Sequence, residues 1–457
     1  MTRSTSRSSP HRAPVREWRF SLVRVVFAFL AVLAGVVLFL CPAGVLIEAI
    51  FDPALNGPGV PKMARRLHRS LTPRYAKWAA ARIAEGKAAK LSLGNVSGTE
   101  WPLYGSVFYL KAEEALQDAW DRDHSLLSEE PRVFARDAID AATRLVIDPN
   151  HAAWVKKYWG EAYLDKEDLF YRMLVISALV SHRRLTGSDE FLPLLRRQAD
   201  GLSTELTASP FGLLDDYPGQ CYPTDIVSAW DAIHRADAVL GTNHSPQIAH
   251  ALRAFTGNHA GALGLPPYFA DSRSGQPADN SRGCSNSNAC MLAPTLWPEI
   301  AGTWYNRHVE YFWQENWLAT GFREFPRGTG KDWYFDVDAG PVVLGNGFAA
   351  SAFGVAAARR NGRFDQAYPL SLEMIALSWP LPDGRLVLPR LVSDSQDAPL
   401  LGEAAILCQL TSQPVAQTRR YHSGLVPGLV FLGLAVQLAI GTFCVRRSVR
   451  FLRVPSR

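Results

Sequence analysis

Two long apolar segments near the ends of the chain constrain its fold more than any other feature. Val25 to Ile47 and Gly424 to Cys444 contain no Asp, Glu, Lys or Arg. Each is long enough to cross a hydrocarbon core of roughly 30 Å as a helix that rises about 1.5 Å per residue. The sequence therefore predicts transmembrane helices at 25–47 and 424–444, with a globular domain at 61–415 between them.

Arginines in the two terminal tails predict the orientation of this domain. Lys and Arg close to a span favour the cytoplasmic side. Two spans place both tails on one side, so we expect cytoplasmic tails at 1–24 and 445–457 and a periplasmic domain held to the inner membrane. Arg419, Arg420 and the basic stretch from Lys62 to Lys90 favour the opposite orientation. A cleaved signal peptide is the alternative for 25–47, but its apolar region usually has only about 7–15 residues.

The composition is that of a globular protein with a membrane anchor. Of the 457 residues, 47% are hydrophobic and 20% are charged, and the formal net charge is +5. Much of the positive charge lies in the two tails, where membrane topology accounts for it. A lipid bilayer is therefore the expected partner, and nucleic acid is not.

Cysteines are few, and two of the six are close together in the sequence. Cys284 and Cys290 bound a short polar segment, Cys-Ser-Asn-Ser-Asn-Ala-Cys. This segment suits a local disulfide in an oxidising compartment, and two free thiols are the alternative. Because a zinc site needs more ligands than the segment supplies, we expect no metal site.

Periodic apolar residues predict a mainly α-helical domain. The clearest helices are at Asp168 to Thr186, Thr224 to Leu240 and Leu344 to Asn361, each followed by a glycine that favours helix termination. Pro61 to Lys90 has a basic face and an Ala/Leu-rich face, which fits either a helix on the membrane surface or the first helix of the domain. Repeated helices separated by aromatic loops predict an α/α toroid, in which loops at one end form a cleft.

Three passages have the order and spacing of motifs in a known family. Trp159-Gly160 is followed by Glu167 to Tyr171 and Leu185 to Ser188, Ser209 to Gly212 is followed by Pro218, and Asp336 to Gly340 is followed by Gly345 to Gly347 and Ser351 to Phe353. Together these passages resemble the linalool dehydratase-isomerase family over about 154–374. The resemblance implies an (α/α)6 barrel, a ring-like homo-oligomer, and cofactor-free dehydration and isomerisation of a small isoprenoid alcohol.

The resemblance also indicates candidate site residues. Asp216 and Asp225 stand where the family has two functional cysteines, at the same spacing, and Leu174 stands where it has a catalytic histidine. Tyr104 lies in Trp-Pro-Leu-Tyr, which resembles a catalytic loop of the family that contains a tyrosine. Glu100 is a displaced counterpart of an aspartate in that loop.

The residues themselves indicate acid–base chemistry. The loop at 214–225 contains three carboxylates and two tyrosines, and two carboxylates in different environments can serve as proton donor and proton acceptor. The alternative is structural: Asp225 or Thr224 caps the following helix, and Asp216 belongs to a turn. Asp336 and Asp338 precede Ala-Gly-Pro, and one of them can point into the cleft. The alternative is a role at a helix entry or in a turn.

Aromatic residues predict the binding surface. Trp333 and Tyr334 can line an apolar or sugar-stacking cleft, although aromatic residues at helical spacing more often belong to the core. We therefore expect catalysis by Asp216, Asp225, Asp338, Tyr104 and Glu100, and substrate binding by Tyr171, Tyr222, Trp333, Tyr334 and Asp336.

The favoured function is a membrane-anchored, cofactor-free lyase or isomerase that acts on an isoprenoid-like alcohol. Anchoring at both ends suits a small-molecule or lipid-borne substrate. One alternative is a hydrolase that acts on carbohydrate or lipid-linked glycan with the same barrel. Another is a non-catalytic membrane binding or assembly protein. Convergence of the three aspartates Asp216, Asp225 and Asp338 on one cleft favours an enzyme, whereas dispersal to helix caps and surface favours the non-catalytic protein.

Overall fold

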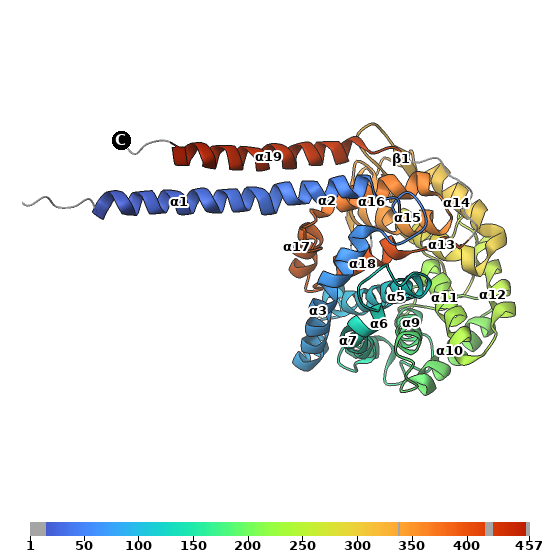
Figure 1. The fold of residues 1–457 in the computed structure, drawn as a ribbon. Helices are drawn as coiled ribbons and strands as arrows, with labels where there is room; N and C mark the ends of the chain where they lie inside the picture. The colour runs from blue at the N-terminus through green and yellow to red at the C-terminus, as the bar shows by residue number, and fades with distance from the viewer. Residues whose placement is uncertain (1–14, 337–338, 416–423, 454–457) are drawn as a thin grey trace, which may run out of the picture.

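The computed structural model describes residues 15–336, 339–415 and 424–453. Figure 1 shows a mainly helical body from which two long helices extend side by side. The first consists of α1 (Val15–Gly35), a π-helical turn (Val36–Leu40) and α2 (Cys41–Ile50), and the second is α19 (Gly428–Arg453). The predicted mainly α-helical fold is confirmed.

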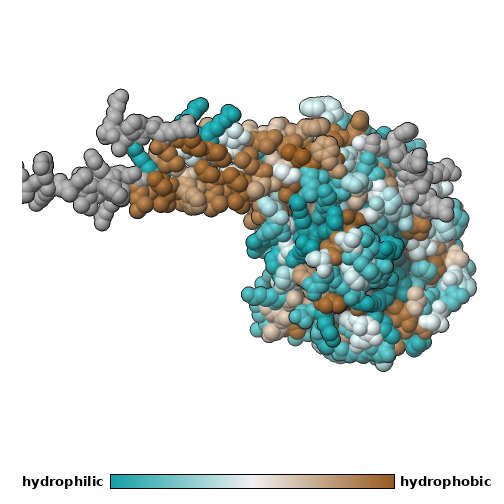
Figure 2. All heavy atoms as spheres, in the orientation of Figure 1, coloured by the Kyte–Doolittle hydropathy of each residue, from teal (hydrophilic) through white to brown (hydrophobic). Residues whose placement is uncertain are grey.

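Both predicted spans are helices. Leu22–Ile50 and Gly428–Leu452 are long and apolar enough to cross a membrane, and Figure 2 shows apolar side chains covering them outside the body. The two helices approach closely at small residues. A Cβ atom added to Gly35 would lie 2.8 Å from the Cβ atom of Cys444, and one added to Gly441 would lie 2.6 Å from the side chain of Leu40. Small residues of this kind are typical of contacts between membrane helices.

Six helices of the body contact one another in a closed cycle. α5 contacts α9, α9 contacts α11, α11 contacts α13, α13 contacts α15, α15 contacts α18, and α18 contacts α5. Their bounds are α5 (Trp101–Arg122), α9 (Leu169–Thr186), α11 (Pro223–Leu240), α13 (Gly283–Leu296), α15 (Phe348–Arg360) and α18 (Leu401–Thr411).

Further helices pack against this cycle. α7 contacts α5 and α9, α10 contacts α9 and α11, α14 contacts α13, α16 contacts α15, and α3 contacts α7 and α18. Their bounds are α3 (Lys62–Glu85), α7 (Arg136–Ile147), α10 (Leu192–Ala208), α14 (Pro298–Phe312) and α16 (Phe364–Ser378).

Short helices and two small antiparallel sheets complete the described body. β1 (Trp313–Glu315) pairs with β2 (Thr320–Phe322), and β3 (Trp333–Asp336), β4 (Gly340–Val343) and β5 (Asn346–Gly347) form the second sheet in that order. The short α-helices are α4 (Val96–Thr99), α6 (Pro131–Phe134), α8 (Ala153–Trp159), α12 (Ser245–Ala251) and α17 (Val387–Ser395). Single 3₁₀ turns occur at Lys87–Lys90, Leu252–Phe255 and Gly257–His259.

The predicted helices are present in the structure, but several boundaries differ; the second apolar helix, for example, begins at Gly428 and not at Gly424. α9 and α11 end at Gly187 and Gly241, whose φ angles of 73° and 68° require the left-handed conformation that glycine adopts easily. α15 begins at Phe348 and not at Leu344, because Asn346 and Gly347 pair with β4. α3 is the first helix of the body, since Leu67 and Leu71 on it are fully buried.

The predicted disulfide is wrong. Cys284 and Cys290 both lie on α13, and both are buried free thiols. Six residues turn an α-helix by roughly 600°, so the two side chains leave different sides of the helix. The polar residues between them indicated a loop, but they are buried and hydrogen-bonded: Ser287 donates to the carbonyl of Ala350, and Asn286 donates to that of Pro266.

This placement predicts the chemistry of both thiols. We expect Cys284 and Cys290 to react with an alkylating reagent when the protein is unfolded without reductant, because neither is oxidised in the folded chain. Mass spectrometry of the peptides measures the added mass. Recovery of the two cysteines in one cross-linked species would contradict the helical placement.

Candidate functional site

Carboxylates gather at the N-terminal ends of three neighbouring helices. Glu100 is the N-cap residue of α5, Asp168 is that of α9, Asp225 lies in the first turn of α11, and Asp216 lies in the loop before α11. We call these four residues the acidic cluster. Three of them, Glu100, Asp168 and Asp216, are buried, with 6%, 0% and 0% of their surface exposed. Buried carboxylates are rare unless they are paired, so their presence here requires an explanation.

Hydrogen bonds hold the loop at 214–225 against α5 and α9. The Tyr217 hydroxyl donates to Glu100 Oε2 over 2.7 Å, and the Leu169 N–H donates to the carbonyl of Asp215 over 3.2 Å. Asp216 Oδ2 accepts a hydrogen bond from the Tyr222 N–H at 2.8 Å. Asp216 therefore does support a turn, as the structural alternative predicted. Tyr222 is the N-cap residue of α11, so Asp225 does not occupy the cap position.

Burial raises the pKa of two members of the acidic cluster well above its ordinary value. For Asp216, the negative charges of Asp225 and Asp168 raise the pKa further, and Oδ1 has no hydrogen-bond partner among the described residues. For Asp168, burial outweighs the opposing charge of Arg172, and the charge of Glu100 raises the pKa further. The raised pKa values favour the protonated form of both side chains, and a carboxylic acid can donate a proton.

Strained backbone accompanies these acids. Glu167 and Asp168 have φ angles of 50° and 47°, in the left-handed region that non-glycine residues rarely adopt. Two consecutive residues in this conformation cost of order 1–3 kcal/mol each, and such strain clusters at functional sites. The strain turns the chain into α9 beside Asp216 and marks this end of the helix as a candidate site.

Carboxylates farther along the same helices have different surroundings. On α11, Asp231 is buried, but the charges of Lys111, Arg235 and Arg360 overcome burial and lower its pKa. Lys111 Nζ lies 3.1 Å from Asp231 Oδ2, and Arg235 also forms an ion pair with Glu114. Among the described residues, no ion pair involves Asp168 or Asp216. The protein thus pairs one buried set of acids with cations, whereas the described residues supply no ion pair to the other set.

Aromatic rings surround the acidic cluster. The ring of Tyr217 lies 5.6 Å from that of Tyr158, 6.4 Å from that of Phe170 and 6.5 Å from that of Tyr222, measured between centroids. Phe170 also lies 6.0 Å from Tyr104. The predicted residues Glu100, Tyr104, Asp216, Tyr222 and Asp225 are therefore brought together by the fold. Cys221 lies in the same loop, and burial raises the pKa of its thiol, which keeps it protonated.

A second group of charged residues lies next to these rings. The ring of Tyr222 lies 5.4 Å from that of Tyr268, and the Arg282 guanidinium lies 3.7 Å above the Tyr268 ring centroid. Arg282 also forms an ion pair of 2.9 Å with Asp336. A chain of contacts thus links the predicted residue Asp336 to Tyr222, and Arg282 already pairs with this aspartate.

Glu324 is an acid that the sequence analysis missed. It accepts hydrogen bonds from the Cys284 N–H at 3.0 Å and the Cys284 thiol at 3.2 Å. Burial raises its pKa to about 7 despite these bonds and the nearby charge of Arg282. A glutamate with this pKa can both accept and donate a proton near neutral pH. The only signal in the sequence is a charged pair, Arg323-Glu324, between two phenylalanines.

Three predicted residues have other surroundings. Tyr171 is buried in the core, where its hydroxyl donates to the carbonyl of Val146 over 2.9 Å. Trp333 is 70% exposed, because alternate residues of β3 face opposite sides, whereas Tyr334 packs on Phe325 at 5.0 Å between centroids. The binding roles of Tyr171 and Trp333 remain predictions. Asp338 lies outside the described residues.

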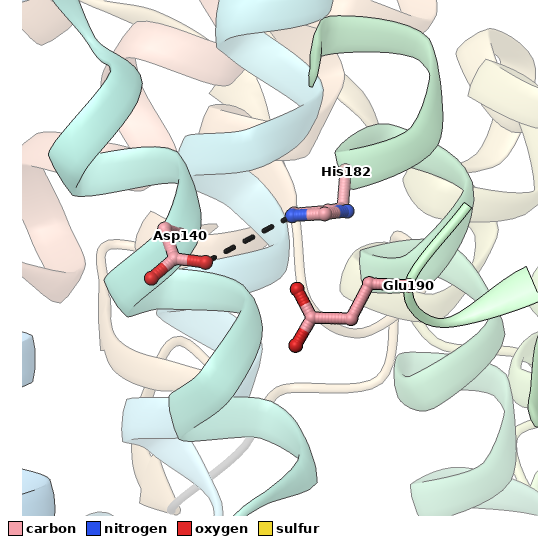
Figure 3. A group of neighbouring side chains, drawn as sticks. All are labelled: Asp140, His182 and Glu190. Atoms are coloured by element: carbon pink, nitrogen blue, oxygen red, sulfur yellow. Dashed lines mark ion pairs between the residues drawn. The ribbon is translucent and has the colours of Figure 1, made fainter. Parts of the chain in front are cut away.

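Another group of possible metal ligands lies at the opposite end of α9. Asp140, His182 and Glu190 converge, as Figure 3 shows, and their ligand atoms lie within 4.8 Å of one another. Arg144 forms ion pairs of 2.9 Å with both Asp140 and Glu190. Because one guanidinium already pairs with both carboxylates, we interpret this group as an ion-pair network that is separate from the acidic cluster.

The acidic cluster therefore combines buried carboxyls that have raised pKa values, the half-buried carboxyl of Asp225 and surrounding aromatic rings. This combination can transfer protons to and from a bound molecule. Comparison of the sequence with protein-family models and with curated proteins found no match.

Proposed function

We propose that this protein is an (α/α)6-barrel enzyme that performs cofactor-free acid–base chemistry at the acidic cluster. The closed cycle of contacts among α5, α9, α11, α13, α15 and α18 supports the barrel. The observation that carries the enzyme proposal is the pair of buried aspartates, Asp168 and Asp216, whose pKa values are raised beside the half-buried Asp225. Stability alone does not favour such residues, because burying a carboxyl without a cation costs free energy.

The proposed reaction is the elimination of water from an alcohol. Asp216 donates its proton to the hydroxyl oxygen as the C–O bond breaks, and water leaves with the bonding electrons. Asp225 accepts a proton from the adjacent carbon, and the electrons of that C–H bond form the double bond. Asp225 lies in the first turn of α11, where the helix dipole favours its ionised form. Proton return from Asp225 to Asp216 completes the cycle.

An isoprenoid-like alcohol is the proposed substrate class. The resemblance to the linalool dehydratase-isomerase family supports it, and the rings of Tyr104, Phe170, Tyr217 and Tyr222 suit an apolar chain beside the carboxyls. To test the class, the purified full-length protein is incubated with terpene alcohols and polyprenyl alcohols, and products are identified by mass spectrometry. Formation of an alkene or an isomerised alcohol supports the proposal.

A glycan hydrolase is the second candidate. It rests on the same observation, because paired carboxyls and aromatic rings also serve glycosidic bond cleavage. Adding oligosaccharides and lipid-linked glycans to the substrate panel separates the two candidates. Release of a reducing sugar with no change in any alcohol would replace the lyase with a hydrolase. No turnover of any class would favour the non-catalytic binding protein.

Membrane anchoring with an extracytoplasmic body completes the proposal. Two apolar helices and two arginine-rich tails support it. We expect a reporter that works only in the cytoplasm to be active when fused after Arg457 and inactive when inserted near Gly257. The reverse result would place the body in the cytoplasm.

A further inference from the structure

Helix α17 presents an apolar face that no described residue covers. Leu388, Leu391 and Val392 are 47%, 60% and 62% exposed. Residues at this spacing share one side of a helix. The opposite side packs on the body, where Ser393 Oγ accepts a hydrogen bond from the Gly402 N–H at the start of α18. The outward apolar side is therefore a surface with an unidentified partner.

The position of α17 identifies this partner. The Val387 N–H donates to the carbonyl of Trp379, and Trp379 Nε1 donates to the carbonyl of Leu38 in the first apolar helix over 2.8 Å. The Trp379 ring also packs edge-on against Phe39 at 5.7 Å. Figure 1 shows α17 on the side of the body from which α1 and α19 extend. α17 therefore begins next to the point where the first span leaves the body.

The exposed part of the first span gives the depth of the bilayer. Most of its large apolar residues from Leu22 to Leu38 are exposed, whereas Val45 and Leu46 are buried and, among the residues that follow, Ile47 is 39% exposed. Leu22 to Leu38 rises about 25 Å as a helix, close to the roughly 30 Å of a hydrocarbon core. One boundary of the core then lies near Leu38, at the level of Trp379. Tryptophan is enriched at that boundary in membrane proteins.

The second span gives another estimate of where the bilayer lies. Because Cys444 lies against Gly35, Arg446 and Arg447 are closer to the body than Arg24 is. If the boundary farther from the body lies at these arginines, the whole hydrocarbon core shifts toward the body. Its nearer boundary then passes the level of Trp379. With either placement of the bilayer, the apolar face of α17 lies at the membrane interface or within it. The exposed residues Arg385 and Arg390 beside this face suit the headgroup region.

We propose that α17 is an interfacial helix that inserts Leu388, Leu391 and Val392 into the bilayer surface. This inference rests on the proposed membrane anchoring. The two spans alone leave the body free to tilt about them, and α17 supplies a third, separate attachment to the same leaflet. The attachment fixes the orientation of the body relative to the membrane.

Site-directed spin labelling of the full-length protein in lipid vesicles tests the proposal. A nitroxide is attached to Leu391→Cys, to Leu30→Cys in the first span, and to Val133→Cys, an exposed apolar position on α6 away from the spans. The protein without an added cysteine, treated identically, gives the background from native thiols. Collision of each nitroxide with oxygen, which enters lipid, and with a water-soluble nickel chelate is measured.

We expect the label at position 391 to lose contact with the nickel chelate and to collide with oxygen, as the label at position 30 does. The label at position 133 retains contact with the chelate. A water-exposed label at 391 together with a lipid-exposed label at 30 would overturn the role of α17 and leave the anchoring intact. Water exposure at both positions would overturn the anchoring itself.

Discussion

Replacing Asp216 with Asn is expected to lower turnover by about 10²–10⁴-fold, the usual contribution of a general acid or base. The amide has nearly the same shape as the carboxylic acid but has no proton of suitable acidity to give to a leaving hydroxyl. It can still accept the Tyr222 N–H, so the loop at 214–225 is expected to keep its conformation. Product formation from the substrate found in the alcohol panel measures the effect.

A matched variant separates chemistry from general damage. Glu190→Gln removes a carboxylate at the opposite end of α9, where Glu190 is exposed and paired with Arg144. We expect this variant to retain its activity. An Asp216→Asn protein that folds and turns over substrate at the original rate would remove Asp216 from the catalytic mechanism.

Replacing Asp231 with Asn is expected to cost about 3–5 kcal/mol of unfolding free energy, the usual effect of breaking a buried ion pair from one side. The variant leaves Lys111 without the carboxylate of Asp231, and Arg235 then shares Glu114 with Arg184. Chemical denaturation of the purified protein measures the change.

The control for this stability prediction is Asp140→Asn. Asp140 pairs with Arg144 at the surface, where 46% of its side chain is exposed. A surface ion pair contributes about 0–1 kcal/mol, so we expect little change. If Asp231→Asn also costs less than about 1 kcal/mol, the buried charges do not stabilise the body in the way proposed here.

The sequence predicted features that depend on local pattern. The two apolar helices, the helices ended by Gly187 and Gly241, and the carboxylate-rich loop before α11 are all visible in short windows of residues. Asp216, Asp225, Glu100 and Tyr104 were identified because they lie in motifs. Asp168 was missed as a site residue because a carboxylate before a helix is ordinarily a cap or turn residue.

Features that depend on distant parts of the chain were not predictable in this way. Glu324 has a raised pKa because folding buries it against Cys284, forty positions earlier in the sequence. Cys284 and Cys290 lie on a buried helix, although the polar residues between them indicated a loop. Trp333 and Tyr334 are adjacent in sequence, yet β3 directs them to opposite faces, and only the strand pairing determines which face is exposed.

Infrared spectroscopy of the Asp216 carboxyl tests the central claim most directly. Labelling the aspartate carboxyl carbon with ¹³C separates the aspartate carbonyl bands from those of lipid esters. At pH 7 we expect a carbonyl band from protonated aspartic acid that is diminished in Asp216→Asn and abolished in Asp168→Asn/Asp216→Asn. Because burial raises both pKa values, the band should convert to carboxylate at a higher pH than the band of an exposed aspartate does. A spectrum at pH 7 that contains only ionised aspartate would contradict the proposed acid–base site.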